Sequence, residues 1–574
     1  MSKRKLLWTG LALFACAGWT QADEVETWRV YEQAFTSGKD YAEGGGDAVV
    51  LDVAFTRDGA NETLVRPGFW DGGATFRVRF APPAAGVWIW RTTCADDAAL
   101  NGLSGSVTAV PYRGTLEIYR RGFVRTEPGK KHFTYADGTP FFYLGDTHWG
   151  LYKEEIDAPG PHAGTTGATS HHAYVVNRRA EQGFTVYQTE PIGAAFNAAD
   201  GTVDASDIPG FQLADRYYQV NADAGLVHAN AEFFFAASMC PPLAQNPAAL
   251  ARLARYWVAR FGAYPVLWTL GQEVDNDFYY ERGAEWRQWN YANNPWVAVA
   301  AAIHACDAYR HPLSAHQENT AHTTVTGRGT QGDKSKISGD GRSSFADEAV
   351  AARTGHSWWA AQWGPPLTSP VNWEVPRDYR ASARPAVNYE GRYCYLWTKD
   401  FGARLQGWVA FLTGFCGYGY GAIDMWLYQS TYDIDRVSRD GVDVITVADK
   451  AVPWSTAIEF PSARQMGYLK SFLTALPWWE LEPDLGDKTL FVPDKDCFGV
   501  CAAKKGELYV LYFYSRATAT GTLQGLAPGA SYAATWFNPR TGEVGTTQPL
   551  AGAQLPSKPD GDDWVLTVRR FLLP

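Results

Sequence analysis

Residues 265–273 read PVLWTLGQE, an apolar run of strand length that ends at a glycine, an amide and the carboxyl group of Glu273. Residues 385–391 read PAVNYEG, and this second apolar run ends at Glu390. Strands buried on both faces that end in polar groups are typical of a parallel (β/α) barrel, where the carboxyl ends of the strands carry the functional groups. The two runs therefore predict a central barrel with Glu273 and Glu390 on its rim.

Strand patterns and helix patterns alternate around these two runs, which predicts eight parallel strands joined by helices. Asn246 is expected to cap one of the helices. The expected strands are residues 140–146, 184–190, 232–238, 265–273, 313–316, 358–362, 385–391 and 417–423. The expected helices are residues 171–182, 247–262, 296–309, 378–383 and 401–413. Residues 320–344 show no periodicity and predict a long rim loop.

Both ends of the chain alternate apolar and polar residues between Gly and Pro turns, which predicts β-sandwiches. The alternation covers residues 48–55, 75–80 and 86–91 near the start, and 508–514, 531–537 and 564–568 near the end. The expected organisation is an N-terminal β-sandwich over residues 23–118, a (β/α)8 TIM barrel over 119–482 and a C-terminal β-sandwich over 483–574.

Composition narrows the classes of partner. The 574 residues carry a net charge of -10, which disfavours nucleic acid and anionic membrane surfaces as partners. Aromatic residues make up 14% of the chain. They can stack on sugar faces, or they can fill a large core and two all-β domains, and composition leaves both explanations open.

The first residues predict an export signal over residues 1–22. Ser2–Lys5 is basic, Leu6–Trp19 is mostly apolar but too short to span a bilayer comfortably, and small residues precede a cleavage point after Ala22. The protein is expected to be periplasmic or secreted, with no transmembrane segment. A lipid anchor at Cys16 is disfavoured because Phe14 fits a lipoprotein box poorly.

Eight cysteines are present, and loss of Cys16 with the leader leaves an odd number, which is not a disulfide framework. Cys497 and Cys501 could pair if a turn lies between them, and the sequence leaves this open. The remaining cysteines in apolar segments are expected to be buried thiols. No spacing indicates a metal site, and no phosphate-binding loop or serine nucleophile elbow is present, so neither a metal nor a cofactor is expected.

Cleavage of an acetal needs a proton donor for the leaving oxygen and a second group on the opposite face of the sugar ring. Glu273 and Glu390 lie about three βα units apart, at roughly 40 residues per unit, which places them on strands four and seven. We expect Glu273 to be the acid/base, with a pKa raised by an apolar wall, and Glu390 to be the ionised nucleophile. The structural alternative is that each acid pairs with an arginine, such as Arg392 beside Glu390.

Other polar and aromatic residues at the expected strand ends are candidates for sugar contact. Asp146 could hydrogen-bond sugar hydroxyl groups or cap a turn, and His148 could orient an acid. Tyr389 could hydrogen-bond the nucleophile or line the pocket. The full set of expected substrate-binding residues is Asp146, His148, Trp149, Gln188, Glu190, Gln272, His316, Gln362 and Tyr389. Taken singly, each is better explained as a packed polar residue, but polar residues at several strand ends together favour a wet, polar cleft. His171 and His172 begin a helix and are expected on the surface.

Five segments resemble one known group. Leu144–Trp149, Trp268–Glu273 and Asn388–Glu390 are similar to the strand ends of the apiosidase-like (β/α)8 glycoside hydrolases. The terminal-helix segment Met466–Leu469, followed by Pro477–Trp479, also resembles that group. The resemblance implies an N-terminal β-sandwich, a C-terminal β-domain labelled collagen-binding, and a retaining, exo-acting glycosidase for plant or microbial polysaccharide side chains.

One departure concerns the fourth strand, which ends in Gly-Gly-Asp in apiosidases and in Gly271–Glu273 here. A glutamate reaches one methylene further than an aspartate, so another pentose, a deoxyhexose or a hexose suits the site as well as apiose. A non-catalytic carbohydrate-binding or adhesion protein on a barrel scaffold is the alternative. A polysaccharide lyase is disfavoured by the acidic rim.

Overall fold

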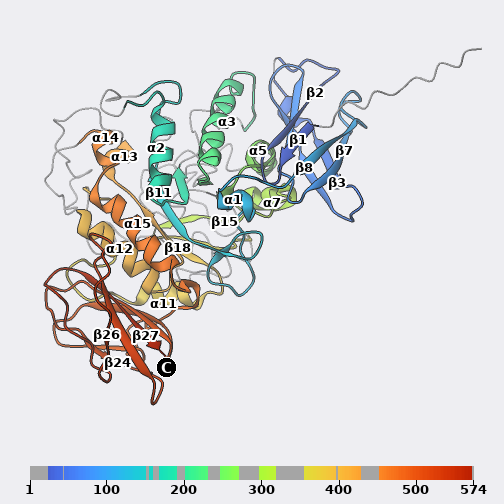
Figure 1. Ribbon diagram of the computed structural model, residues 1–574. Helices are drawn as coiled ribbons and strands as arrows, with labels where there is room; N and C mark the ends of the chain where they lie inside the picture. The colour runs from blue at the N-terminus through green and yellow to red at the C-terminus, as the bar shows by residue number, and fades with distance from the viewer. Residues whose placement is uncertain are drawn as a thin grey trace, which may run out of the picture.

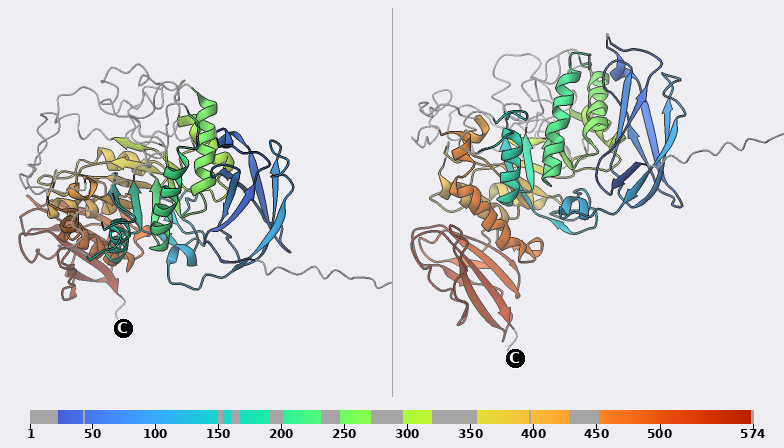
Figure 2. Two further views of the ribbon diagram at one scale, coloured as in Figure 1. Left: turned by 90° about the horizontal axis from the view of Figure 1, so that it is seen from above. Right: turned by 45° about the horizontal axis from the view of Figure 1, so that its top comes forward.

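The computed structural model describes residues 23–42, 44–149, 154–159, 167–189, 201–230, 246–270, 296–318, 355–395, 398–427 and 452–571. A parallel barrel occupies the middle of the molecule (Figure 1). The N-terminal strands and the C-terminal strands lie at opposite ends of it, as the two further views also show (Figure 2). Among the described residues, no helix is both long enough and apolar enough to cross a membrane.

The barrel sheet has the order β15-β14-β13-β12-β11-β19-β18-β17-β16, and its neighbouring strands pair in parallel. Its strands are β11 (Tyr143–His148), β12 (Val186–Thr189), β13 (Val227–Asn230), β14 (Val266–Thr269), β15 (Leu313–Ser314), β16 (His316–Glu318), β17 (Trp359–Gln362), β18 (Ala386–Glu390) and β19 (Gly417–Tyr420). The two ends of this order, β15 and β16, are separated in the chain by Ala315 alone. β15 and β16 together therefore form the fifth strand position, where the sheet closes on itself, and the expected eight-stranded barrel is confirmed.

Helices alternate with these strands on the outside of the barrel (Figure 1). They are α1 (Glu117–Arg120), α2 (His171–Glu181), α3 (Ile208–Asp223), α5 (Pro247–Phe261), α7 (Trp296–Cys306), α11 (Glu374–Ala381), α12 (Asp400–Leu412), α13 (Ile423–Leu427), α14 (Trp454–Ala457) and α15 (Pro461–Thr474). The Asn246 side chain accepts a hydrogen bond from the Ala249 N–H at 3.1 Å, which confirms the expected cap of α5.

The third strand lies earlier than expected. It is β13, Val227–Asn230, which follows α3 and pairs with both β12 and β14. The expected strand at 232–238 lies outside the described residues. The phenylalanine-rich run after Asn230 is more apolar than the short sequence VHAN, so hydrophobicity alone favoured the wrong segment. The expected loop at 320–344 also lies outside the described residues.

The N-terminal domain contains two packed sheets, as expected of a sandwich. One has the order β1 (Asp23–Glu26), β8 (Ser104–Val110), β7 (Gly86–Cys94), β3 (Leu51–Arg57), β4 (Thr63–Pro67), and the other β2 (Tyr31–Thr36), β6 (Thr75–Phe80), β5 (Phe69–Trp70). Phe55 of β3 stacks on Phe80 of β6 with ring centroids 4.0 Å apart, which joins the sheets.

Buried ion pairs attach this domain to the barrel. Arg79 of β6 reaches Asp215 of α3 at 2.6 Å, and Arg260 of α5 reaches Asp71 at 3.0 Å and Asp215 at 2.6 Å. Because removing one member would leave an uncompensated buried charge, these contacts fix the domain against α3 and α5.

The C-terminal domain has a sheet of order β20 (Glu482–Pro483), β22 (Gly499–Lys504), β23 (Leu508–Phe513), β27 (Trp564–Phe571), β25 (Ser531–Phe537), β26 (Gln548–Pro549), and a ribbon of β21 (Phe491–Pro493) with β24 (Gly521–Leu523). It packs on α12, where Arg404 binds Asp563 at 2.6 Å and Trp408 stacks on Tyr512 at 5.8 Å. Cys497 and Cys501 are both buried and free, so they form no disulfide.

A short hairpin precedes the barrel and closes its amino-terminal end. It consists of β9 (Phe133–Thr134) and β10 (Pro140–Phe141). Phe133 packs against Tyr143, where β11 starts, and against Trp358, which directly precedes β17. The end of the barrel opposite the carboxyl ends of the strands is therefore filled with aromatic rings.

Candidate active site

Glu390 is the last residue of β18, and its two carboxyl oxygens face different side chains. Its Oε1 accepts a hydrogen bond from the Tyr393 hydroxyl, and its Oε2 lies 3.3 Å from Nε2 of His316. The same hydroxyl accepts a hydrogen bond from the Trp149 indole N–H. Glu390 is only 4% exposed, so these contacts fix the orientation of its carboxyl group.

His316 begins β16 and faces Glu390 as a neutral ring. Burial lowers the pKa of His316 to about 3. A neutral imidazole carries no charge, so its 3.3 Å approach to Glu390 is a close packing contact and not an ion pair. The Trp149 ring lies nearly parallel to the His316 ring, with centroids 6.1 Å apart. Side chains that follow or lie on strands one, five and seven therefore meet at one point.

Gln362 and Tyr389 lie beside this group. Gln362 ends β17 and pairs in register with Glu390. The Tyr389 ring packs between His316 at 5.2 Å and Trp358 at 5.9 Å. The sequence suggested Tyr389 as a hydrogen-bond partner of Glu390, but the hydroxyl that donates to Oε1 belongs to Tyr393. An aromatic hydroxyl within one turn of the acid was the signal that could have identified it.

Gln188 lies inside the barrel. Its side-chain N–H donates to the Tyr389 carbonyl at 2.8 Å, and its side-chain oxygen accepts from the Tyr143 hydroxyl at 3.1 Å. A Cβ added at Gly145 would lie 2.0 Å from that same oxygen, which shows that residue 145 faces the interior too. Gln188 therefore links strands one, two and seven below the rim.

Asp146 and His148 point the other way, toward α2. Side chains alternate along a strand, so these two residues face outward when Tyr143 and Gly145 face inward. Asp146 Oδ2 binds His148 Nε2 at 2.7 Å and also accepts from Arg179 of α2. Both residues are almost fully buried. These contacts give Asp146 and His148 a structural role between strand and helix, and argue against the expected contact with a sugar.

Glu154 and His172 extend this buried network of side-chain contacts. Glu154 binds His148 Nδ1 at 2.7 Å and His172 Nδ1 at 2.6 Å. Burial alone would lower the pKa of His148, but the charges of Asp146 and Glu154 raise it to about 9. Burial would raise the pKa of Glu154, yet the charge and hydrogen bond of His148 hold it well below its ordinary value. No pattern in the sequence pointed to Glu154.

The expectation that His171 and His172 lie on the surface is wrong. Both are fully buried, because the first turn of α2 packs against the barrel. His171 stacks on Trp454 at 4.1 Å, and burial lowers the pKa of His171 to about 4.

Arg392 was the alternative partner for Glu390. Burial lowers the pKa of the Arg392 guanidinium, whereas an ion pair with Glu390 would raise it. Three other expected site residues, Glu273, Gln272 and Glu190, lie outside the described residues. The strand before Glu273 is β14, the fourth of the barrel, and β18 is the seventh, as expected.

Within the described ranges, no group of three or more His, Cys, Asp or Glu side chains is placed to hold a metal ion.

Comparison with known protein families decides the class. A family model described as "Apiosidase-like, catalytic domain" matches residues 127–480. The chain belongs to the apiosidase-like family. Models described as "Domain of unknown function (DUF5060)" and "Putative collagen-binding domain of a collagenase" match residues 24–95 and 492–569 of this apiosidase-like chain. No curated protein matches it.

Solved structures agree with this assignment at the level of the fold. A crystal structure described as a "putative glycoside hydrolase from Bacteroides vulgatus ATCC 8482" has a TM-score of 0.63 and 16% identity, covering 96% of this chain and 100% of that one. A glycoside hydrolase family 5 structure from the same organism has a TM-score of 0.53 and 16% identity, covering 79% of this chain and 94% of that one. With the family match, this makes the chain a glycosidase and sets aside the non-catalytic alternative.

Proposed function

We propose that this apiosidase-like chain is a retaining, exo-acting glycosidase that cleaves side chains of plant or microbial polysaccharides, with Glu390 as nucleophile and Glu273 as acid/base. The observation that carries the proposal is the hydrogen bond that Tyr393 donates to Glu390 at the end of the seventh strand, with the neutral His316 ring 3.3 Å from the other carboxyl oxygen. A hydrogen bond donated to a carboxylate favours its ionised form, which is the form that attacks an anomeric carbon.

The position of β14 supports Glu273 as the partner. The last described residue after β14 is Leu270, which is buried, and Glu273 follows within three residues. Because β14 and β18 are strands four and seven of one barrel, acids at their carboxyl ends can flank one glycosidic bond. In a retaining enzyme the two carboxyl groups lie about 5–5.5 Å apart.

The neighbours of Glu390 divide into two roles in this proposal. Trp149 and His316 are buried, and we assign them to positioning, Trp149 through its hydrogen bond to Tyr393 and His316 through its 3.3 Å approach to Glu390. Gln362 lies beside Glu390 on the next strand and contacts the sugar in this proposal. Gln272 and Glu190 follow strands four and two, and we assign them to sugar contact as well.

We also propose that residues 1–22 direct export to the periplasm or the medium, which predicts a mature N-terminus at Asp23 by N-terminal sequencing.

A screen of aryl glycosides tests the proposal, with apiosides, other pentosides, deoxyhexosides and hexosides in one panel. Proton NMR of the first product formed then shows its anomeric configuration. The account predicts retention, and release of monosaccharide from the start of polysaccharide digestion. Inversion would overturn the retaining assignment, and early release of long oligosaccharides would overturn exo action.

A further inference from the structure

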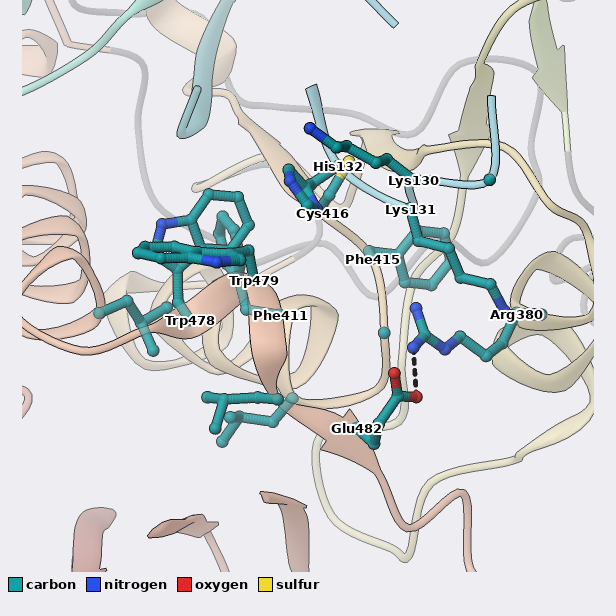
Figure 3. Close-up of a pocket in the computed structure, with 15 residues that line it drawn as sticks. Lys130, Lys131, His132, Arg380, Phe411, Phe415, Cys416, Trp478, Trp479 and Glu482 are labelled. Carbon is teal, nitrogen blue, oxygen red and sulfur yellow. Dashed lines mark hydrogen bonds and ion pairs between the residues drawn. The ribbon is translucent and has the colours of Figure 1, made fainter. Parts of the chain in front are cut away.

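A cavity lies at the opposite end of the barrel from Glu390. Its volume is about 260 Å³, and its lining includes Lys131, Arg380, Cys416, Trp478 and Trp479 (Figure 3). Cys416 directly precedes the start of β19, and Arg380 lies near the end of α11, before β18 begins. Glu390 lies at the far end of β18. The cavity is therefore separate from the candidate active site.

Aromatic rings form one side of this cavity (Figure 3). The rings of Trp478 and Trp479 are nearly perpendicular, at 88°, with centroids 6.2 Å apart, and Trp478 is equally perpendicular to Phe411. Trp478 is buried by its neighbours, whereas Trp479 is 40% exposed. An indole that keeps so much open surface at a cavity mouth offers a flat apolar face on which a ring can stack.

Cationic side chains form the other side. Lys130, Lys131 and Arg380 line the cavity with Glu482 as the one carboxylate among its lining residues, although the whole chain has a net charge of -10. Arg380 pairs with Glu482, but Glu482 is 71% exposed on its side chain, so water screens that pair. Lys130 likewise pairs with the part-exposed Glu127.

Lys131 differs from the other two cations because its ammonium group donates to the Arg380 main-chain carbonyl at 2.6 Å. A carbonyl fixes the position of the ammonium group without neutralising its charge. Burial lowers the pKa of Lys131 and the nearby Arg380 charge lowers it further, while Glu482 offsets part of this effect, so an added anion would favour the charged ammonium group.

We propose that this cavity is a non-catalytic binding site for a uronic acid residue of an acidic polysaccharide, with the sugar ring against Trp479 and its carboxylate beside Lys131 and Arg380. The cavity lies just below the usual range of roughly 300–1,000 Å³ for small-ligand sites, which suits one sugar ring better than a long chain. The site would hold the enzyme on an acidic main chain while the barrel rim cleaves side chains. The choice of a saccharide rests on the glycosidase assignment, but not on the role of Glu390.

Calorimetric titration of the full chain tests the site, with the Glu390→Gln variant as background so that no turnover occurs. The probes are trigalacturonic acid and its methyl ester, which differ only in the charge of the carboxyl groups. We expect saturable binding of the acid and binding of the ester that is weaker by about tenfold or more, the effect of losing a charge-assisted hydrogen bond.

Two variants and a matched control locate the bound acid. Trp479→Ala and Lys131→Met should each weaken binding by about tenfold. Lys39→Met should leave it unchanged, because Lys39 also donates to a main-chain carbonyl, that of Asp96, but in the N-terminal domain. Trp479 is exposed enough for its variant to fold, which keeps the test valid if Lys131→Met does not fold.

Three results would overturn the site: equal binding of acid and ester, binding unaffected by Trp479→Ala, or no saturable binding of the acid. Binding by Glu390→Gln that disappears in Trp479→Ala supports the site even if Glu390 proves not to be the nucleophile. Failure of the binding site and failure of the proposed mechanism are therefore distinguishable.

Discussion

The Tyr393 hydroxyl donates a hydrogen bond to Oε1 of Glu390, three residues before it in the chain. Because the same hydroxyl accepts the Trp149 indole N–H, its own proton is directed at Glu390. This contact connects the residue after strand one to the acid that ends strand seven, and it makes Tyr393 a positioning residue for the proposed nucleophile.

Tyr393→Phe removes this donor while keeping the ring. We expect kcat on an aryl glycoside to fall by about 10- to 100-fold, the range for losing a hydrogen bond to a charged group. The pKa of Glu390 should rise, since the lost bond favoured its ionised form, so the acidic limb of the rate profile should move to higher pH. Tyr514→Phe, which removes a bond to the Ser369 carbonyl at 3.0 Å, is the control. An unmoved acidic limb would contradict the positioning role.

Glu390→Gln should abolish turnover while the fold remains. We expect kcat to fall by about 1,000-fold or more, as when a covalent nucleophile is removed. Circular dichroism and thermal unfolding should show a protein close to the wild type. Glu507→Gln, an exposed glutamate in the C-terminal domain, should keep full activity. A Glu390→Gln variant that keeps most of its turnover would refute the assignment.

Glu273→Ala should affect substrates according to their leaving groups. General acid catalysis contributes about 100- to 10,000-fold when the leaving group is a sugar hydroxyl. An activated phenolate needs little protonation, so kcat/KM for a dinitrophenyl glycoside should change far less than for the natural oligosaccharide. Equal losses on both substrates would mean that Glu273 is not the acid.

The buried charges around His148 predict how stability depends on pH. The folded pKa of His148, about 9, lies above the unfolded value of about 6.5. The contribution of His148 to the free energy of unfolding is therefore complete below pH about 6.5 and is lost as the pH rises through about 9. Glu154 and Asp146 have lowered pKa values, so their contributions are complete above pH about 4 and are lost in acid.

Thermal unfolding followed from pH 6 to pH 10 checks this prediction. The wild type should lose stability over the alkaline part of the range, and His148→Gln should lose much less while starting from a lower Tm. If the two proteins show parallel alkaline losses, His148 is not the group that titrates.

The sequence predicted the barrel well because β14 and β18 are buried along their whole length and each begins with apolar residues. It misplaced the third strand because Val227–Asn230 is short and lies close to a more hydrophobic run. Strand identity follows from local composition, whereas the choice between competing apolar runs depends on pairing with neighbours.

The site was harder to predict than the fold. Glu390 follows from its strand, but the outward direction of Asp146 and His148 depends on which residues of β11 enter the barrel. Tyr393 is close to Glu390 in sequence, which makes it a candidate partner, but only the path of the chain after β18 brings its hydroxyl to the carboxyl group. The cavity at Trp479 escaped sequence reasoning because its lining comes from separate segments, including residues 129–132, 411–416 and 478–482.

Trapping of the covalent intermediate tests the central claim most directly. The probe is the dinitrophenyl glycoside of the sugar found in the screen, with fluorine in place of the hydroxyl next to the anomeric carbon, so that the intermediate forms and persists. Mass spectrometry of the digested protein should find the added sugar on the peptide that contains Glu390. A sugar attached to any other carboxyl group, or an active enzyme that accumulates no adduct and inverts its product, would contradict the account.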